Sequence, residues 1–210
     1  MRNSLFAATE WITRFAYVNI LWMAFTIVGL GIFGLFPATV AMFTLIRQWI
    51  MGNTDEPVFT RFWQTYRKEF LKSNLIGLVF YVIGLLFYIN FQFIQFYQGG
   101  FYDVVKVPLY IFMLAISLTL LYIIPTFVHY ELRFLDIWKN AFLVMLIHPL
   151  HNISMVVGAG AVLYVMYSFP GSLFFFGASL VGYIIMGTCY HAFRKVAVKK
   201  ETIVEDNAGT

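Results

Sequence analysis

Two histidines three positions apart are the nearest approach to a metal-ligating pair in this sequence. His148 and His151 flank a Pro-Leu dipeptide, and the only acidic residues near them along the chain are Glu131 and Asp136. A zinc site needs three or four protein ligands, and the intervening proline disrupts the helical geometry that would present both rings on one face. We therefore favour an interfacial role, in which the histidines hydrogen-bond around a break between helices, over a metal site.

A second candidate is a strip of amides beside aromatic rings in the segment 88–102. Glutamines recur there every three residues, at Gln92, Gln95 and Gln98. Aromatic faces with neutral hydrogen-bonding groups suit a sugar, so Gln92, Gln95 and Tyr97 are candidate carbohydrate contacts. The competing interpretation is the belt of aromatic residues that marks a membrane–water interface, and we favour that belt.

The motifs that identify common enzymes and nucleotide-driven pumps are missing from the sequence. It contains no phosphate-binding loop, no HExxH pair, no GxSxG elbow and no paired cysteines. We therefore expect a protein that is not an enzyme, that holds no cofactor or metal, and that does not drive transport alone with ATP. The single cysteine, Cys189, leaves no internal disulfide to form.

The composition predicts the medium that surrounds these residues. Of 210 residues, 61% are hydrophobic and only 11% are charged, whereas soluble domains carry roughly 25% charged residues. This deficit predicts an all-α integral membrane helix bundle in contact with the lipid bilayer. The net charge of +4 lies in loops and at the C-terminal end rather than along one folded surface, so we expect no nucleic-acid partner.

Five apolar runs have lengths near the ~20 residues that a membrane-spanning helix needs. We predict a single transmembrane domain over 1–200 and a flexible C-terminal tail over 201–210. A short interfacial helix is expected over 3–14, and a break in the first span at Pro37, because proline cannot donate to the helical ladder. The predicted spans are 17–36, 73–93, 107–128, 151–167 (starting at His151 or Asn152) and 172–190.

The segment 59–72 is amphipathic. Its apolar positions follow the spacing i, i+3, i+4, i+7 and i+11, and basic and amide side chains fall between them, which predicts a helix lying in the membrane plane with its aromatic side down. The aromatic positions are Phe59, Phe62, Trp63, Tyr66 and Phe70. The basic side could contact anionic lipid, which we favour, or a transporter subunit.

Lys and Arg residues indicate the orientation. With five spans, 11 of the 14 Lys and Arg residues fall on one side of the membrane. The side richer in these residues is normally cytoplasmic, which predicts an N-terminus outside and a C-terminus in the cytoplasm. Arg47, at the end of the first polar connection, is expected to reach towards lipid headgroups.

Three adjacent features carry a resemblance to a known family: the Phe36-Pro37-Ala38-Thr39 tetrapeptide, the turn at 52–59 and the segment 62–70. With them the chain resembles the YesL-like family of small multi-pass membrane proteins of unknown function from Gram-positive bacteria. The resemblance implies a plasma-membrane protein often encoded beside sugar ABC importers and polysaccharide-degrading enzymes, and it implies no catalytic residue. The residues that match the family pattern are Phe36, Pro37, Ala38, Thr39, Asp55, Phe59, Phe62 and Phe70.

Two functional hypotheses follow. The first is a non-enzymatic accessory component of a carbohydrate ABC import system, which docks on permease subunits through the stretch 36–72 and through glycine-lined helix faces. The alternative is a small stand-alone permease for sugar fragments. The cores of the last four spans contain no charged residue, which argues against ion-coupled transport, because such transporters normally place ionisable groups at depth.

Overall fold

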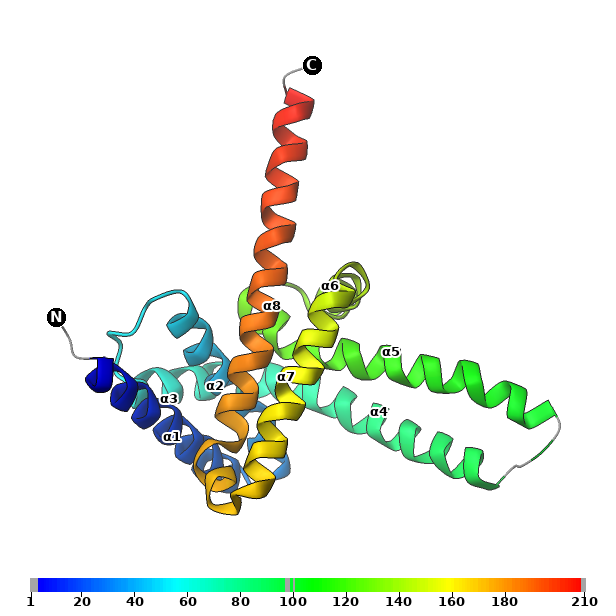
Figure 1. Ribbon diagram of the computed structural model, residues 1–210, viewed down its shortest axis with the longest axis horizontal. Helices are drawn as coiled ribbons and strands as arrows, with labels where there is room; N and C mark the ends of the chain where they lie inside the picture. The colour runs from blue at the N-terminus through cyan, green and yellow to red at the C-terminus, as the bar shows by residue number, and fades with distance from the viewer. Residues whose placement is uncertain (1–3, 97–98, 100, 209–210) are drawn as a thin grey trace.

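The computed structural model describes residues 4–96, 99 and 101–208, and every regular element among them is a helix. The all-α class is therefore confirmed. The elements are α1 (Ser4–Val28), α2 (Ile32–Ile50), α3 (Val58–Lys68), α4 (Phe70–Phe96), α5 (Phe101–His129), α6 (Phe134–Ile147), α7 (Pro149–Ser168) and α8 (Pro170–Ala208), shown in Figure 1.

Six of these helices are long and apolar enough to cross a membrane, as judged by length and composition. The prediction of a multi-pass membrane bundle is confirmed, but the count of five spans is wrong by one. The six apolar stretches are Ala8–Val28, Ile32–Ile50, Phe70–Phe96, Val104–His129, Pro149–Ser168 and Pro170–Val196. The remaining two helices, α3 and α6, have 11 and 14 residues and are too short to span ~30 Å of hydrocarbon.

The miscount arises at the turn between α1 and α2. The chain reverses over 29–31, where Leu30 and Gly31 have φ of 61° and 74°, a backbone region that glycine enters without steric cost. Pro37, where a break was predicted, lies inside α2 and is buried. Neighbouring helices can compensate for the hydrogen bond that a proline removes from a membrane helix, so α2 continues to Ile50.

The N-terminal residues also differ from the prediction. The short interfacial helix expected over 3–14 is not separate, because α1 is continuous from Ser4 to Val28. Its first turns are anchored to α2: the rings of Trp11 and Phe15 lie 5.9 and 5.7 Å from the ring of Trp49. These aromatic contacts extend the helix beyond the apolar run that the sequence pattern recognised.

The core of the molecule forms around α2, which packs against α1, α3, α4, α5 and α8. Small residues allow the closest approach. Gly182 of α8, for example, faces Ile46, Met42 and Phe43 of α2, which lie 3.2 to 3.4 Å from where its Cβ would stand. The helices α7 and α8 run side by side, and α8 continues beyond the bundle to Ala208 (Figure 1). The flexibility predicted for 201–210 stays a prediction.

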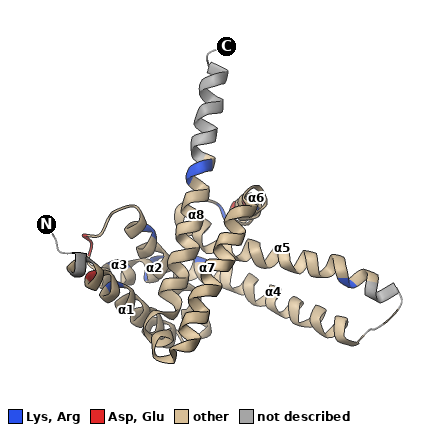
Figure 2. Ribbon diagram, viewed as in Figure 1, with Lys and Arg blue, Asp and Glu red and all other residues tan. Residues whose placement is uncertain are grey.

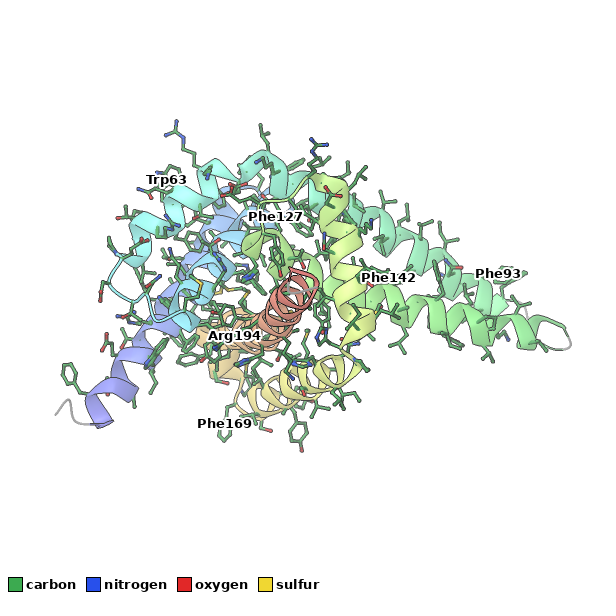
Figure 3. All side chains as sticks on the ribbon, turned by 90° about the horizontal axis from the view of Figure 1, so that it is seen from above. Trp63, Phe93, Phe127, Phe142, Phe169 and Arg194 are labelled. Carbon is green, nitrogen blue, oxygen red and sulfur yellow. The ribbon has the colours of Figure 1, made fainter. Side chains whose placement is uncertain are left out.

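The hairpin of α4 and α5 leaves this core. It extends away from the other helices, crosswise to α7 and α8 (Figure 1). Seen from above, no other helix accompanies its outer half, where Phe93 lies, whereas Trp63 lies on the opposite side of the molecule, on α3 (Figure 3). In this arrangement α4 and α5 are not parallel to α7 and α8, so these four helices cannot all lie perpendicular to the plane of one membrane.

Candidate functional site

The family tetrapeptide lies at the junction of three helices. Phe36 of α2 is buried against the bare face of Gly77 on α4, where a Cβ would overlap its ring. The rings of Phe80 and Tyr81 lie 5.2 and 5.5 Å from it in edge contacts. Gly77 and the aromatic ring are thus complementary shapes that hold α4 on α2.

The other half of the tetrapeptide binds α1. The Thr39 hydroxyl accepts a hydrogen bond from Trp22 Nε1 at 3.0 Å and donates to the Leu35 carbonyl at 2.7 Å. Pro37 and Ala38 are buried. All four motif residues are therefore engaged within the chain, which gives them a packing role.

A cluster of aromatic rings forms around Phe25, near the end of α1. The rings of Phe62, Trp63 and Tyr66 lie between 5.0 and 5.6 Å from it. The Tyr66 hydroxyl donates to the Phe25 carbonyl at 3.2 Å, and burial raises the pKa of this phenol. The predicted division of α3 into an aromatic side and a polar side is confirmed, and its aromatic side faces α1.

Two of the family residues on this segment face outward. Phe59 is 50% exposed, and Asp55 is exposed and makes no ion pair with a described residue. Phe62 is fully buried, and Phe70 packs against Tyr66 with ring centroids 5.6 Å apart. Only Phe59 and Asp55 are therefore placed to meet a partner without unpacking the core.

The polar side of α3 is basic and open. Arg61 pairs with Glu56 at 3.5 Å, and Lys68 approaches Glu69 at 3.8 Å. A shallow groove on this side is lined by Trp63, Gln64, Arg67 and Lys68. Basic residues beside an exposed tryptophan suit a membrane surface, so both earlier interpretations of this face stay open.

The glutamine strip lies on the outer half of α4. Gln92 and Gln95 are exposed, and Gln92 Nε2 donates to the Tyr88 hydroxyl at 2.9 Å. Tyr97 lies outside the described residues. A groove of about 360 Å³ lies elsewhere, between α1 and Val58 of α3. The sugar contact stays a prediction.

Two buried asparagines join helices in the core, and the sequence analysis assigned neither of them a role. Asn19 of α1 donates to the Phe174 carbonyl at 2.7 Å and accepts from the backbone N–H groups of Ala178 and Ser179 on α8. Asn152 of α7 accepts from the Tyr122 hydroxyl of α5 at 2.7 Å. A lone amide in an apolar run is a signal for such a bond.

Arg47 does not extend to headgroups as the sequence suggested. Its Nε donates to His129 Nδ1 at 3.2 Å, which joins α2 to the end of α5. The His129 ring is in turn packed against Tyr130 and Phe193, at 4.6 and 4.8 Å. The half-buried guanidinium thus takes its hydrogen-bond partner inside the bundle.

The histidine pair lies where α6 ends and α7 begins. The rings of His148 and His151 are 5.2 Å apart, and His148 Nδ1 lies 3.2 Å from the Val144 carbonyl. Within the described part of the chain, no three His, Cys, Asp or Glu residues are grouped so that they could hold a metal ion. The predicted break between helices at this position is confirmed.

Comparison with known proteins places this geometry in a family. The sequence profile described as "Protein of unknown function, DUF624" matches residues 15–91, a region that contains the tetrapeptide, α3 and most of α4. No solved structure matches the chain.

Three relatives from Bacillus subtilis (strain 168) align with most of the chain. The uncharacterized protein YteU is 36% identical over 188 residues, which cover 89% of this chain and 84% of the relative. YesV is 35% identical over 193 residues, covering 92% and 93%, and YesL is 32% identical over 200 residues, covering 95% and 94%. Both are likewise uncharacterized, so they support the family and not an activity.

Proposed function

Because the chain belongs to the YesL-like family of membrane proteins of unknown function, we propose that it is a non-enzymatic accessory component of a carbohydrate ABC import system. It docks on permease subunits in the bacterial plasma membrane. The sugar connection comes from the gene neighbourhood that the resemblance implies. The docking role is supported by the way this chain leaves some of its helices uncovered.

The α4–α5 hairpin is the observation that carries the proposal. Only 11% of the α4 span and 17% of the α5 span is buried within the chain, against 61% of the α2 span. The hairpin is almost free of charged side chains (Figure 2), and large apolar groups such as Leu85, Ile111 and Phe112 are 59 to 62% exposed. A hairpin of this kind can pack along the membrane helices of another protein.

The face of α3 would supply a second contact. Phe59, Asp55 and the basic groove are the exposed parts of the segment that matches the family. Of the glycines on helix faces, Gly77 and Gly182 meet side chains of α2, whereas Gly84 of α4 has nothing within 4 Å of its Cβ position. Docking is therefore assigned to the hairpin and to α3 rather than to the tetrapeptide.

The six-helix count changes the orientation that we propose. If every apolar helix crosses the bilayer, both termini lie on one side, and Lys106 is the only one of the 14 Lys and Arg residues near the opposite ends. We infer that both termini are cytoplasmic. In this topology the α4–α5 hairpin must rotate until α4 and α5 run roughly parallel to α7 and α8 in the membrane. Reporter fusions at each terminus test it, and an extracytoplasmic N-terminus would contradict it.

Co-purification tests the accessory role. The tagged chain, extracted from native membranes in mild detergent, should enrich a carbohydrate permease subunit. A hairpin double variant, Ile111→Ala with Phe112→Ala, should reduce this enrichment severalfold, because it removes large side chains from the uncovered surface. The matched control is Val157→Ala with Tyr164→Ala on exposed positions of α7. If no permease is enriched, or if both double variants lose it equally, the proposal fails.

One observation favours the alternative, a small permease for sugar fragments. The hydrogen-bonded pair of Gln92 and Tyr88 places amide and phenol groups on an otherwise apolar helix. Against it, the buried amides of Asn19 and Asn152 are already engaged between helices. Sugar uptake into vesicles containing only this protein, lost in a Gln92→Leu and Gln95→Leu variant, would support the permease over the accessory role.

A further inference from the structure

The four histidines of this chain gather at one end of the bundle, around a single turn of α8. His129 packs on Tyr190 and Phe193 of α8. His148 and His151 lie at the start of α7, and His191 and Lys195 are exposed one turn apart on α8. Lys195, His148 and His191 all lie near enough to His151 for their charges to act on its ring. We call His148, His151, His191 and Lys195 the cationic cluster.

The cationic cluster has no described counter-charge. Among residues whose side chains the structure describes, no carboxylate lies within 4.0 Å of any of its members. Arg194, the residue before Lys195 on α8, adds a further positive charge to this end of the helix (Figure 3). Glu131, before α6, and Asp136, in its first turn, form no ion pair with the cluster.

The cluster also stands at the positive end of a helix. His148 precedes α7, makes no side-chain cap, and is followed by Pro149 at the first helical position. The first turn of a helix carries a partial positive charge that favours anions and disfavours cations. This end of α7 therefore favours an anion over a further cation.

We propose that the cationic cluster binds a phosphate group at the cytoplasmic end of α7 and α8. Lys195 supplies a charge-assisted hydrogen bond to the phosphate oxygens, the imidazole N–H groups donate further hydrogen bonds, and α7 contributes its dipole. Two sources share this chemistry: the headgroup of an anionic lipid in the inner leaflet, and a free phosphate in the cytoplasm. The inference does not rest on the accessory role, since no member of the cluster lies on the hairpin or on α3; its cytoplasmic placement rests on the topology inferred above.

Two binding measurements on the purified full chain separate these sources. Native mass spectrometry from mixed micelles counts bound phosphatidylglycerol against phosphatidylcholine, and calorimetry in detergent measures inorganic phosphate. The test variant is His151→Gln with Lys195→Gln. The matched control is Lys68→Gln, which removes one charge from an 80% exposed lysine on α3. Lys195→Arg should retain binding.

We expect the chain to bind either phosphatidylglycerol or inorganic phosphate. The affinity for that probe should fall on the order of tenfold in the test variant and stay unchanged in Lys68→Gln. If phosphatidylglycerol stays bound in preference to phosphatidylcholine, the ligand is a lipid headgroup. If inorganic phosphate gives a binding isotherm, the ligand is a soluble phosphate. Equal binding by all variants, or no binding of either probe, overturns the proposal. So does Zn²⁺ binding that is lost in His148→Gln, which would assign a metal instead.

Discussion

The helix α2 and the α4–α5 hairpin are built from similar apolar residues but meet different surroundings. Six in ten residues of the α2 span are buried by protein, against about one in ten for α4. Prolines occur in both, at Pro37 of α2 and at Pro108 and Pro125 of α5, so proline does not separate the two regions. Within its span α2 also carries an arginine that hydrogen-bonds His129 and a threonine that accepts a hydrogen bond from α1. Polar groups are tolerated in a membrane helix where neighbouring helices satisfy them, which the dense packing around α2 allows.

This contrast also separates fold from function. The tetrapeptide 36–39, by which the family is recognised, is packed inside the core. The hairpin, α7 and one face of α3 are the parts that the chain itself leaves largely uncovered. The most recognisable residues of the chain therefore specify its packing, and an interaction site is to be sought where the sequence pattern is least distinctive.

The largest effect should come from two glycines on the same helix. Gly77→Leu forces a side chain into the Phe36 ring, whereas Gly84 has nothing within 4 Å of its Cβ position. We expect Gly77→Leu to lower the free energy of unfolding by about 3 kcal/mol and Gly84→Leu to change it little. Denaturant titration in mixed micelles measures both. If both variants lost the same free energy of unfolding, Gly84 would be packed as tightly as Gly77, and the hairpin would not be uncovered at that position.

A smaller effect is expected from two asparagines in apolar helices. Asn19 makes three hydrogen bonds to the backbone of α8, while Asn90 bonds only the Leu86 carbonyl of its own helix. Asn19→Leu should cost about 2 kcal/mol, because it leaves buried backbone groups without their partner. Asn90→Leu should be close to neutral in the same titration. A neutral Asn19→Leu would mean that α8 recovers its own backbone bonds, and the clamp between α1 and α8 would then be incidental.

Much of the bundle was predictable, because long apolar runs identify membrane helices wherever turns separate them. The number of spans was predicted wrongly because of the segment 29–37, where Gly29, Gly31 and Pro37 each indicate a break in the helix. The choice among them depended on what surrounds each residue: Gly29 lies where a Cβ would meet Gly34 and Tyr66, and Pro37 is buried between helices. Contacts of this kind join residues far apart in sequence. The same holds for Arg47, whose partner His129 lies 82 positions away.

The smallest of the three effects should come from a single hydroxyl of the tetrapeptide. Thr39→Val keeps the shape of the side chain but removes the acceptor of the Trp22 indole N–H, which lies 3.0 Å away on α1. A hydrogen bond between membrane helices contributes about 0.6 kcal/mol on average, so we expect a loss near 1 kcal/mol and a shift in tryptophan fluorescence. The matched control is Thr119→Val on α5, where the hydroxyl bonds only its own helix, at Ala115, and the loss should be smaller. If the two variants cost the same, the tetrapeptide threonine acts through its methyl group alone, and the contact between α1 and α2 rests on apolar packing.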